Sequence, residues 1–364
     1  MMTRSLRHVA LLGAVMLGTG CEQSVAPAES NVVPRPVFLA ADKVQLTSRV
    51  SGVAYDPEAF FFNLAMCGPT CQIPPFLSEG VPHYLRSAVR GANVMPLDVA
   101  AQPQPQPIGP PAVADNLGMW LLPAVPARYE VPYFMLATGA GALPDPTEPL
   151  GPPLPQPPRT DYLPTLTLRP VMTGGSGTCV SQEAAHIGKN GVLEAVSRHL
   201  TATGTPTTVE DLVNPTKYWG TNVLWFYAAG NPVLRAPADN VSLEVNISGG
   251  LQQTYVIDWA PPGVLPPFLN QSSRGFYVTN AATSSLGLYV VLLPVAGPPP
   301  SSIQYLVKDT KTSTSAQRPW EFPPIQGGIG PGSVTFVGVQ MFYKSNPLRP
   351  SYPPPPQLCL PPGL

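Results

Sequence analysis

Alternation of apolar and polar residues is strict over part of the second half of the chain. The run 241–248 (VSLEVNIS) places an apolar side chain at every second position. Successive side chains of a β-strand point to opposite faces, so this period of two predicts a strand with one buried and one solvated face. The run 222–229 (NVLWFYAA), which is apolar after Asn222, instead predicts a strand of the buried type.

Strand-like patterns recur along most of the chain, with Gly, Pro and Asn between them. They cover 44–50, 53–55, 95–99, 119–122, 129–135, 166–168, 255–259, 276–278, 286–293, 303–307 and 337–343. Gly52 interrupts the first pattern and predicts a bulge there. Strands at this spacing favour an all-β fold built as β-sandwiches.

The centre of the chain has a helical pattern instead. Apolar residues recur on one helix face over 191–200, Asn190 is placed to cap the N-terminus, and Gly204 follows as a stop. The stretch 207–210 (TTVE) fits a capping box and starts a second short helix that is ended by Pro215. The sequence therefore predicts a short helical segment between strand-rich halves.

Composition supports this division. Proline accounts for 51 of 364 residues, and an interior proline removes a helical hydrogen bond, so long helices are excluded. The proline-rich stretches 102–111 and 143–158 are typical of solvated polyproline-like loops. Charged residues make up only 11% and form no basic cluster, which argues against a nucleic-acid partner.

The predicted fold is two Ig-like or transthyretin-like β-sandwich halves with long proline-rich loops. The predicted segments are a signal peptide at 1–20, a flexible tether at 21–43, a first sandwich at 44–170, a helical linker at 171–216, a second sandwich at 217–345 and a proline-rich tail at 346–364. Each half has enough residues to bury a core of its own.

The N-terminus has the layout of a bacterial secretory signal. Arg4 and Arg7 precede the apolar run 9–17, and small residues at 18–20 lead directly into Cys21. The apolar run is too short to span a bilayer, which takes about 20 residues. The segment resembles a lipoprotein signal, although Gly18 stands where that pattern usually has Leu. The resemblance implies that Cys21 is acylated, and Glu22 after it is compatible with delivery to an outer membrane, on its periplasmic or outer face. The alternative is an ordinary cleaved signal with an incidental cysteine.

Lipidation of Cys21 leaves an even number of cysteines: Cys67, Cys71, Cys179 and Cys359. An even remainder in an exported chain predicts two disulfides. Of the three pairings we favour Cys67–Cys71 and Cys179–Cys359. A redox pair at Cys67 and Cys71 is disfavoured by its spacing, and a zinc site that adds His83 lacks a fourth ligand at the usual spacing.

Motifs for catalysis are missing from the sequence. His83, His186 and His199 belong to no metal-binding pattern, and the Gly-rich stretch 174–177 lacks the final glycine of a nucleophile elbow. Asp56 follows a strand and is expected to fix a turn. We therefore predict no enzymatic activity, no catalytic residue, no metal and no cofactor.

Aromatic residues are concentrated at the start of the second half and offer one binding hypothesis. The set comprises Tyr218, Trp219, Trp225, Tyr227 and Trp259. Exposed on one face, these rings would form a glycan-stacking platform. Aromatic residues also favour strands and bury large areas, so the core of the second sandwich is the favoured interpretation.

Two short motifs give a family resemblance. The stretch 50–56 (VSGVAYD) resembles the opening strand of carboxypeptidase regulatory-like domains, and 90–94 (RGANV) is similar to the start of their next strand. Residues 230–233 and 240–243 repeat the pattern in the second half. The family usually has Val in place of Ala54, and far fewer residues between the motifs. The resemblance implies a transthyretin-like sandwich without enzymatic activity.

These observations together predict a lipid-anchored, non-enzymatic protein of the bacterial cell envelope. Its role would be structural or protein-binding, with other envelope proteins as partners and the lipid as its contact with the membrane. The alternative is a carbohydrate-binding module that uses the aromatic set on a polysaccharide. A hydrolase with a site assembled from distant residues is the third and weakest hypothesis.

Overall fold

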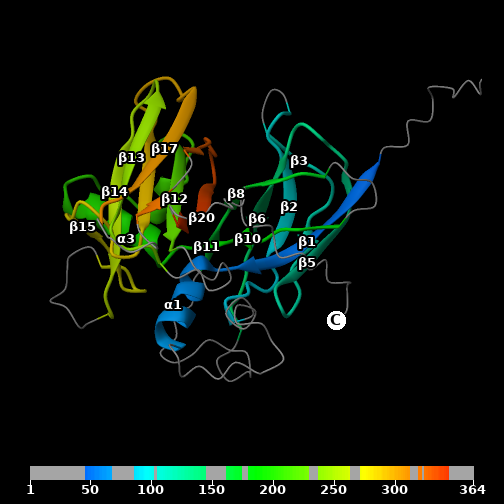
Figure 1. Ribbon diagram of the computed structural model, residues 1–364, viewed down its shortest axis with the longest axis horizontal. Coiled ribbons are helices and arrows are strands. Elements are labelled where there is room, and N and C mark those ends of the chain that lie inside the picture. The colour runs from blue at the N-terminus through cyan, green and yellow to red at the C-terminus, as the bar shows by residue number, and fades with distance from the viewer. Residues whose placement is uncertain are drawn as a thin grey trace, which may run out of the picture. The chain divides into compact units, whose positions relative to one another are not determined.

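The computed structural model describes residues 46–67, 86–101, 105–144, 161–173, 179–228, 237–262, 271–311, 319–321 and 324–343. All of them belong to one compact unit, Gln45–Leu364. Strands predominate in it (Figure 1), so the prediction of an all-β fold is confirmed.

The elements of the first half are β1 (Thr47–Tyr55), α1 (Pro57–Cys67), β2 (Asn93–Asp98), β3 (Gln106–Pro107), β4 (Ala112–Val113), β5 (Met119–Pro126), β6 (Tyr133–Thr138), β7 (Tyr162–Leu163), β8 (Thr165–Val171), β9 (Cys179–Ser181), β10 (Ala184–Ala185) and β11 (Ile187–Gly188). The elements that follow are α3 (Val192–Ala202), α4 (Val209–Leu212), β12 (Tyr218–Tyr227), β13 (Val241–Ser248), β14 (Gln253–Trp259), β15 (Phe276–Thr279), β16 (Leu288–Pro294), β17 (Ser302–Asp309), β18 (Trp320–Glu321), β19 (Ile325–Gln326), β20 (Val334–Gln340) and β21 (Phe342–Tyr343).

One 10-stranded sheet combines strands from both ends of the chain. Its order is β15-β14-β16-β12-β20-β8-β6-β2-β3, with β4 also paired to β2. Strand β20 pairs in parallel with β12 on one side and with β8 on the other. Strands assigned to two separate sandwiches thus share one hydrogen-bonded sheet, and the arrangement in two halves is not confirmed.

Smaller sheets pack against this large sheet through two apolar cores. Strand β1 pairs with β5, β9 and β10, and Val50 of β1 packs in one core with Met135 of β6. Strand β17 pairs with β13 and β19, and its Tyr305 shares a second core with Leu224 of β12. The layering is that of sheets packed face to face.

A third core lies where the helices meet the large sheet. Helix α3 buries its apolar face, and Val196 packs in the same cluster as Trp225 of β12 and Phe276 of β15. Helix α1, which the sequence analysis did not anticipate, adds the consecutive aromatic residues Phe60 to Phe62. None of the described helices combines the length and the apolar character needed to cross a membrane.

Local predictions agree with the structure at some positions and are wrong at others. The strand over 241–248 is β13. The capping box predicted over 207–210 lies one residue further along the chain, where Thr208 pairs with Asp211. Strand β1 runs through Gly52, and its irregular register lies between Ser48 and Val50. Gly52 is needed because a Cβ atom there would lie 1.7 Å from the carbonyl oxygen of Gln182.

The cap of α3 also differs from the prediction. Gly191, and not Asn190, is the N-cap residue, and it makes no side-chain cap bond. An uncapped helix start leaves backbone N–H groups without partners. The group that replaces the cap comes from a distant part of the chain and is described below.

Candidate functional site

Three of the predicted cysteine sites, Cys21, Cys71 and Cys359, lie outside the described residues. Cys67 ends α1, and its side chain is also outside the described set. Cys179, at the start of β9, is disulfide-bonded. Its pairing with Cys359 and the lipidation of Cys21 stay predictions.

The aromatic set is divided between the two faces of the large sheet. Trp225 and Tyr227 are buried in the helix-side core, where Tyr218 and Trp259 pack from its edge. Trp219 packs on the opposite face, against the core that contains Tyr305, and donates its indole N–H to Gly297 O. The five rings therefore do not share a stacking face, and the favoured interpretation as core residues fits the structure better.

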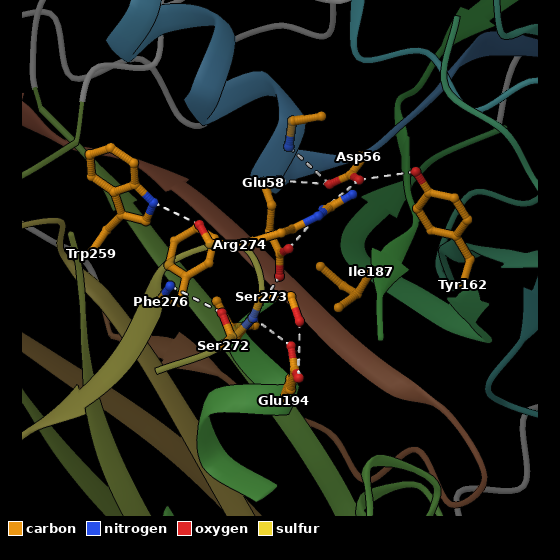
Figure 2. A network of polar contacts seen from close by, with 12 residues as sticks. Asp56, Glu58, Tyr162, Ile187, Glu194, Trp259, Ser272, Ser273, Arg274 and Phe276 are labelled. Carbon is orange, nitrogen blue, oxygen red and sulfur yellow. Dashed lines mark hydrogen bonds and ion pairs between the residues drawn. The ribbon is translucent and has the colours of Figure 1, made fainter. Parts of the chain in front are cut away.

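A buried ionic network is the most unusual polar feature of the described chain (Figure 2). It begins at Asp56, between β1 and α1. Oδ1 of Asp56 accepts the N–H groups of Glu58 (2.9 Å) and Ala59 (3.0 Å), which belong to the first turn of α1. Asp56 is thus a helix cap more than a simple turn residue, and Pro57 at the first helical position suits this role.

Glu58 supplies the cap that α3 lacks. Its Oε1 accepts the N–H of Val192 at 2.9 Å, although the two residues are far apart in the chain. A Cβ atom on Gly191 would lie 1.7 Å from Oε2 of Glu58, so only glycine leaves room for the carboxylate. A carboxylate at this position also interacts favourably with the positive end of the helix dipole.

Arg274 joins the two carboxylates. Its Nη1 lies 2.8 Å from Asp56 Oδ2 and 2.8 Å from Glu58 Oε2, and all three side chains are 0% exposed. Its backbone N–H donates to Asn190 O beside the start of α3. Within the described part of the chain, Nε and Nη2 of Arg274 have no hydrogen-bond partner. The guanidinium thus links β1, α1 and the start of α3.

The turn that presents Arg274 is fixed on several sides (Figure 2). The indole N–H of Trp259 donates to Arg274 O at 2.8 Å. Ser273 donates through N and Oγ to the carboxylate of Glu194 on α3, and Glu194 also pairs with Arg198. Arg274 therefore reaches the carboxylates from a backbone that α3 and β14 hold in place.

Two ring systems continue the network on the Asp56 side. The hydroxyl of Tyr162 donates to Asp56 Oδ2 at 3.0 Å, and the Tyr162 ring stacks on His186 with 4.7 Å between centroids. Nε2 of His186 lies 3.2 Å from Gly139 O, and the backbone of Leu163 also interacts with the ring. His186 is thus a core histidine of this network.

Charge balance in the network is uneven, because one guanidinium faces two carboxyl groups. Burial raises the pKa of Glu58 to about 7; Arg274 opposes this shift and the Asp56 carboxylate adds to it. Burial also lowers the pKa of His186 to about 4, so the ring is neutral at pH 7. Burial, followed by Asp56, keeps the pKa of Tyr162 well above its usual value, so the hydroxyl remains a donor.

This geometry suits structural support better than catalysis. A general acid or base must come within hydrogen-bond reach of a substrate, and the carboxyl groups of Asp56 and Glu58 are fully buried. Nor do the described residues contain a group of three or more His, Cys, Asp or Glu placed to hold a metal ion. The network ties together elements that lie far apart in the chain.

Sequence reasoning missed most of this network. The order Asp56-Pro57-Glu58 ahead of an apolar run is itself a helix-start signal, and it would have predicted α1. His83 lies outside the described residues, and His199 contacts the Tyr255 ring edge-on. Arg274 carries no local signal, because its partners lie more than 200 residues earlier in the chain.

Comparison with known proteins gives no assignment. No protein-family model and no curated protein matches the chain. Among solved structures, the minor pilin GBS52 of Streptococcus agalactiae is 12% identical over 84% of this chain and 100% of its own, with a TM-score of 0.20. A variant of the major pilin of Streptococcus pyogenes is 8% identical over 82% of this chain and 98% of its own, with a TM-score of 0.17. At TM-scores this low the similarity supports no conclusion about fold family or function.

Proposed function

We propose that the chain is a lipid-anchored, non-enzymatic protein of the bacterial cell envelope with a structural or protein-binding role. The observation that carries the non-enzymatic part is the full burial of Asp56, Glu58 and Arg274. These three fully buried charged side chains bind one another and the starts of α1 and α3. Their contacts hold the fold together.

The envelope location is supported by the N-terminal sequence. Arg4 and Arg7, the apolar run 9–17 and the small residues before Cys21 form the pattern on which export and acylation depend. The disulfide at Cys179 agrees with an oxidising compartment. A lipid on Cys21 would hold the β-rich unit at a membrane surface through the segment before Gln45.

Mass spectrometry of the mature N-terminus tests the anchor. We expect a chain that begins at Cys21 and carries added acyl mass, and that partitions into the detergent phase after membrane extraction. The Cys21→Ser variant is the matched control, and we expect it to partition into the aqueous phase. An uncleaved Met1, or an unmodified Cys21, would contradict lipidation.

Two further measurements address the role. Cross-linking in the native envelope, followed by mass spectrometry, should recover another envelope protein on residues of the 45–364 unit. Recovery of lipid alone would contradict a protein-binding role. A fluorophosphonate probe that labels a serine of the folded chain would contradict the absence of enzymatic activity.

A further inference from the structure

Two polar side chains lie unpaired inside the core between β12–β20 and the β13–β17–β19 sheet. Asn222 and Thr335 are each 0% exposed. Within the described residues, neither Oδ1 nor Nδ2 of Asn222 has a hydrogen-bond partner, and Oγ1 of Thr335 has none. A buried polar group without a partner costs roughly 1–3 kcal/mol, and native proteins rarely leave one in this state.

The register of the sheet brings these two side chains together. Asn222 of β12 lies opposite Thr335 of β20 in a parallel pair, where neighbouring strands are about 4.8 Å apart. Leu224 and Val337, two residues further along each strand, both belong to the core that contains Tyr305. Because side chains alternate between faces, Asn222 and Thr335 point to that same side.

Further groups lie beside the pair or in the same core. Gly330 lies so close that a Cβ atom on it would be 2.9 Å from Thr335 Oγ1, and a Cβ atom on Gly220 would be 3.4 Å from Gly330 N. Tyr305, from the facing sheet, is 0% exposed, and its hydroxyl has no partner among the described residues. A side chain on Gly330 would therefore press directly on the Thr335 hydroxyl.

We propose that Asn222 and Thr335, with Gly330 beside the Thr335 hydroxyl, form an enclosed site for an ordered water molecule. A buried water makes two to four hydrogen bonds, and the amide and hydroxyl groups here offer both donors and acceptors. None of these side chains is ionised at neutral pH, so the site suits a neutral molecule. Water is the smallest molecule that can form hydrogen bonds with both side chains at once.

The site also specifies how the two parts of the sheet join. A shift of β20 by one residue against β12 would move Thr335 to the opposite, apolar face. Thr335 would then be buried without Asn222 and without the shared water. The hydrated pair therefore favours the observed register at the parallel joint between β12 and β20.

A crystal structure of the full chain at a resolution that shows ordered water is the direct test. We expect density within hydrogen-bond distance of both Asn222 and Thr335 Oγ1, and its loss in Gly330→Ala, where the new methyl group occupies the space. Gly328→Ala is the matched control, because a Cβ atom there meets nothing closer than 4.0 Å. An empty space between Asn222 and Thr335 in the unmodified protein overturns the proposal.

Equilibrium unfolding gives a second, independent readout. Thr335→Val removes only the hydroxyl's hydrogen bonds, and we expect it to lower the folding equilibrium constant about fivefold in the unmodified chain. In an Asn222→Leu background the same change should have almost no effect, since the water is already lost. Thr335→Ser, which keeps the hydroxyl, should retain the water density. Equal effects of Thr335→Val in both backgrounds would overturn the proposal.

Discussion

The carboxylate of Glu58 occupies the space that a side chain on Gly191 would need, and from there it caps the helix that Gly191 begins. Oε1 accepts the N–H of Val192, and Oε2 lies 1.7 Å from the position of a Cβ atom on Gly191. The position of the Glu58 carboxylate thus requires glycine at 191, which lies 133 positions later in the chain. The helix that starts at Gly191 in turn takes its cap from Glu58. Several expectations about stability depend on this relationship.

Gly191→Ala should destabilise the fold strongly. The new methyl group displaces the Glu58 carboxylate from Val192 N and from Arg274 together, so a buried ion pair and a helix cap are both lost. We expect the free energy of unfolding to fall by about 3 kcal/mol or more, measured by urea denaturation. Gly297→Ala is the control: a Cβ atom there meets nothing within 4 Å, so the change should be almost neutral. Equal effects of the two substitutions would refute this account.

Arg274→Met should cost more than the loss of one surface ion pair. The substitution keeps the apolar stem but leaves Asp56 and Glu58 buried without a cation. We expect a loss of roughly 3–5 kcal/mol in the free energy of unfolding.

Neutralising the acids in the same background should restore part of that loss. The triple variant with Asp56→Asn and Glu58→Gln has no uncompensated charge, so it should be more stable than Arg274→Met alone. If neutralising the acids brings no recovery, the network does not act through charge.

Glu58 should make the protein less stable as the pH rises. Its folded pKa of about 7 lies above the ordinary value of 4.5, so the folded state binds more protons between these values. Linkage then requires the free energy of unfolding to fall from pH 4.5 to pH 7, by up to about 3 kcal/mol. Comparing Glu58→Gln with the unmodified protein across this range isolates the contribution, which should vanish in the variant.

His186 should act in the opposite direction. Burial lowers its folded pKa to about 4 from 6.5, so the unfolded state binds more protons between these values and stability is lost as the pH falls. In the unmodified protein the two slopes oppose each other between pH 4.5 and 6.5.

Single variants should separate the two groups. In Glu58→Gln, where His186 remains, the free energy of unfolding should rise as the pH goes from 4 to 6.5. In His186→Gln, where Glu58 remains, it should fall as the pH goes from 4.5 to 7. Thermal or urea unfolding at each pH measures both. Slopes of the same sign in the two variants would show that these side chains do not carry the effect.

Disulfide mapping should identify the partner of Cys179, which is disulfide-bonded. We expect a non-reduced peptide that joins Cys179 to Cys359, and a second that closes Cys67 onto Cys71. A peptide linking Cys179 to Cys67 or Cys71 would refute this pairing, and reduction of the sample should release every linked peptide.

The sequence by itself determined the local features of this protein. The period-two pattern of β13, the presence of a capping box ahead of α4 (to within one residue) and the amphipathic face of α3 follow from neighbouring residues, because they depend on backbone geometry and side-chain direction alone. The abundance of proline excluded a helical fold, because each interior proline removes a backbone hydrogen bond of a helix.

Only the tertiary structure decided which distant residues meet. The parallel pairings of β20 place it between strands from both halves. Arg274 meets Asp56 and Glu58 across more than 200 positions of the chain. Such contacts leave no periodic mark in the sequence, since each residue satisfies its charge or hydrogen bond with a partner that only folding brings near. The N-terminal sequence predicts the location of the protein. The contacts of the buried network are decided by the fold.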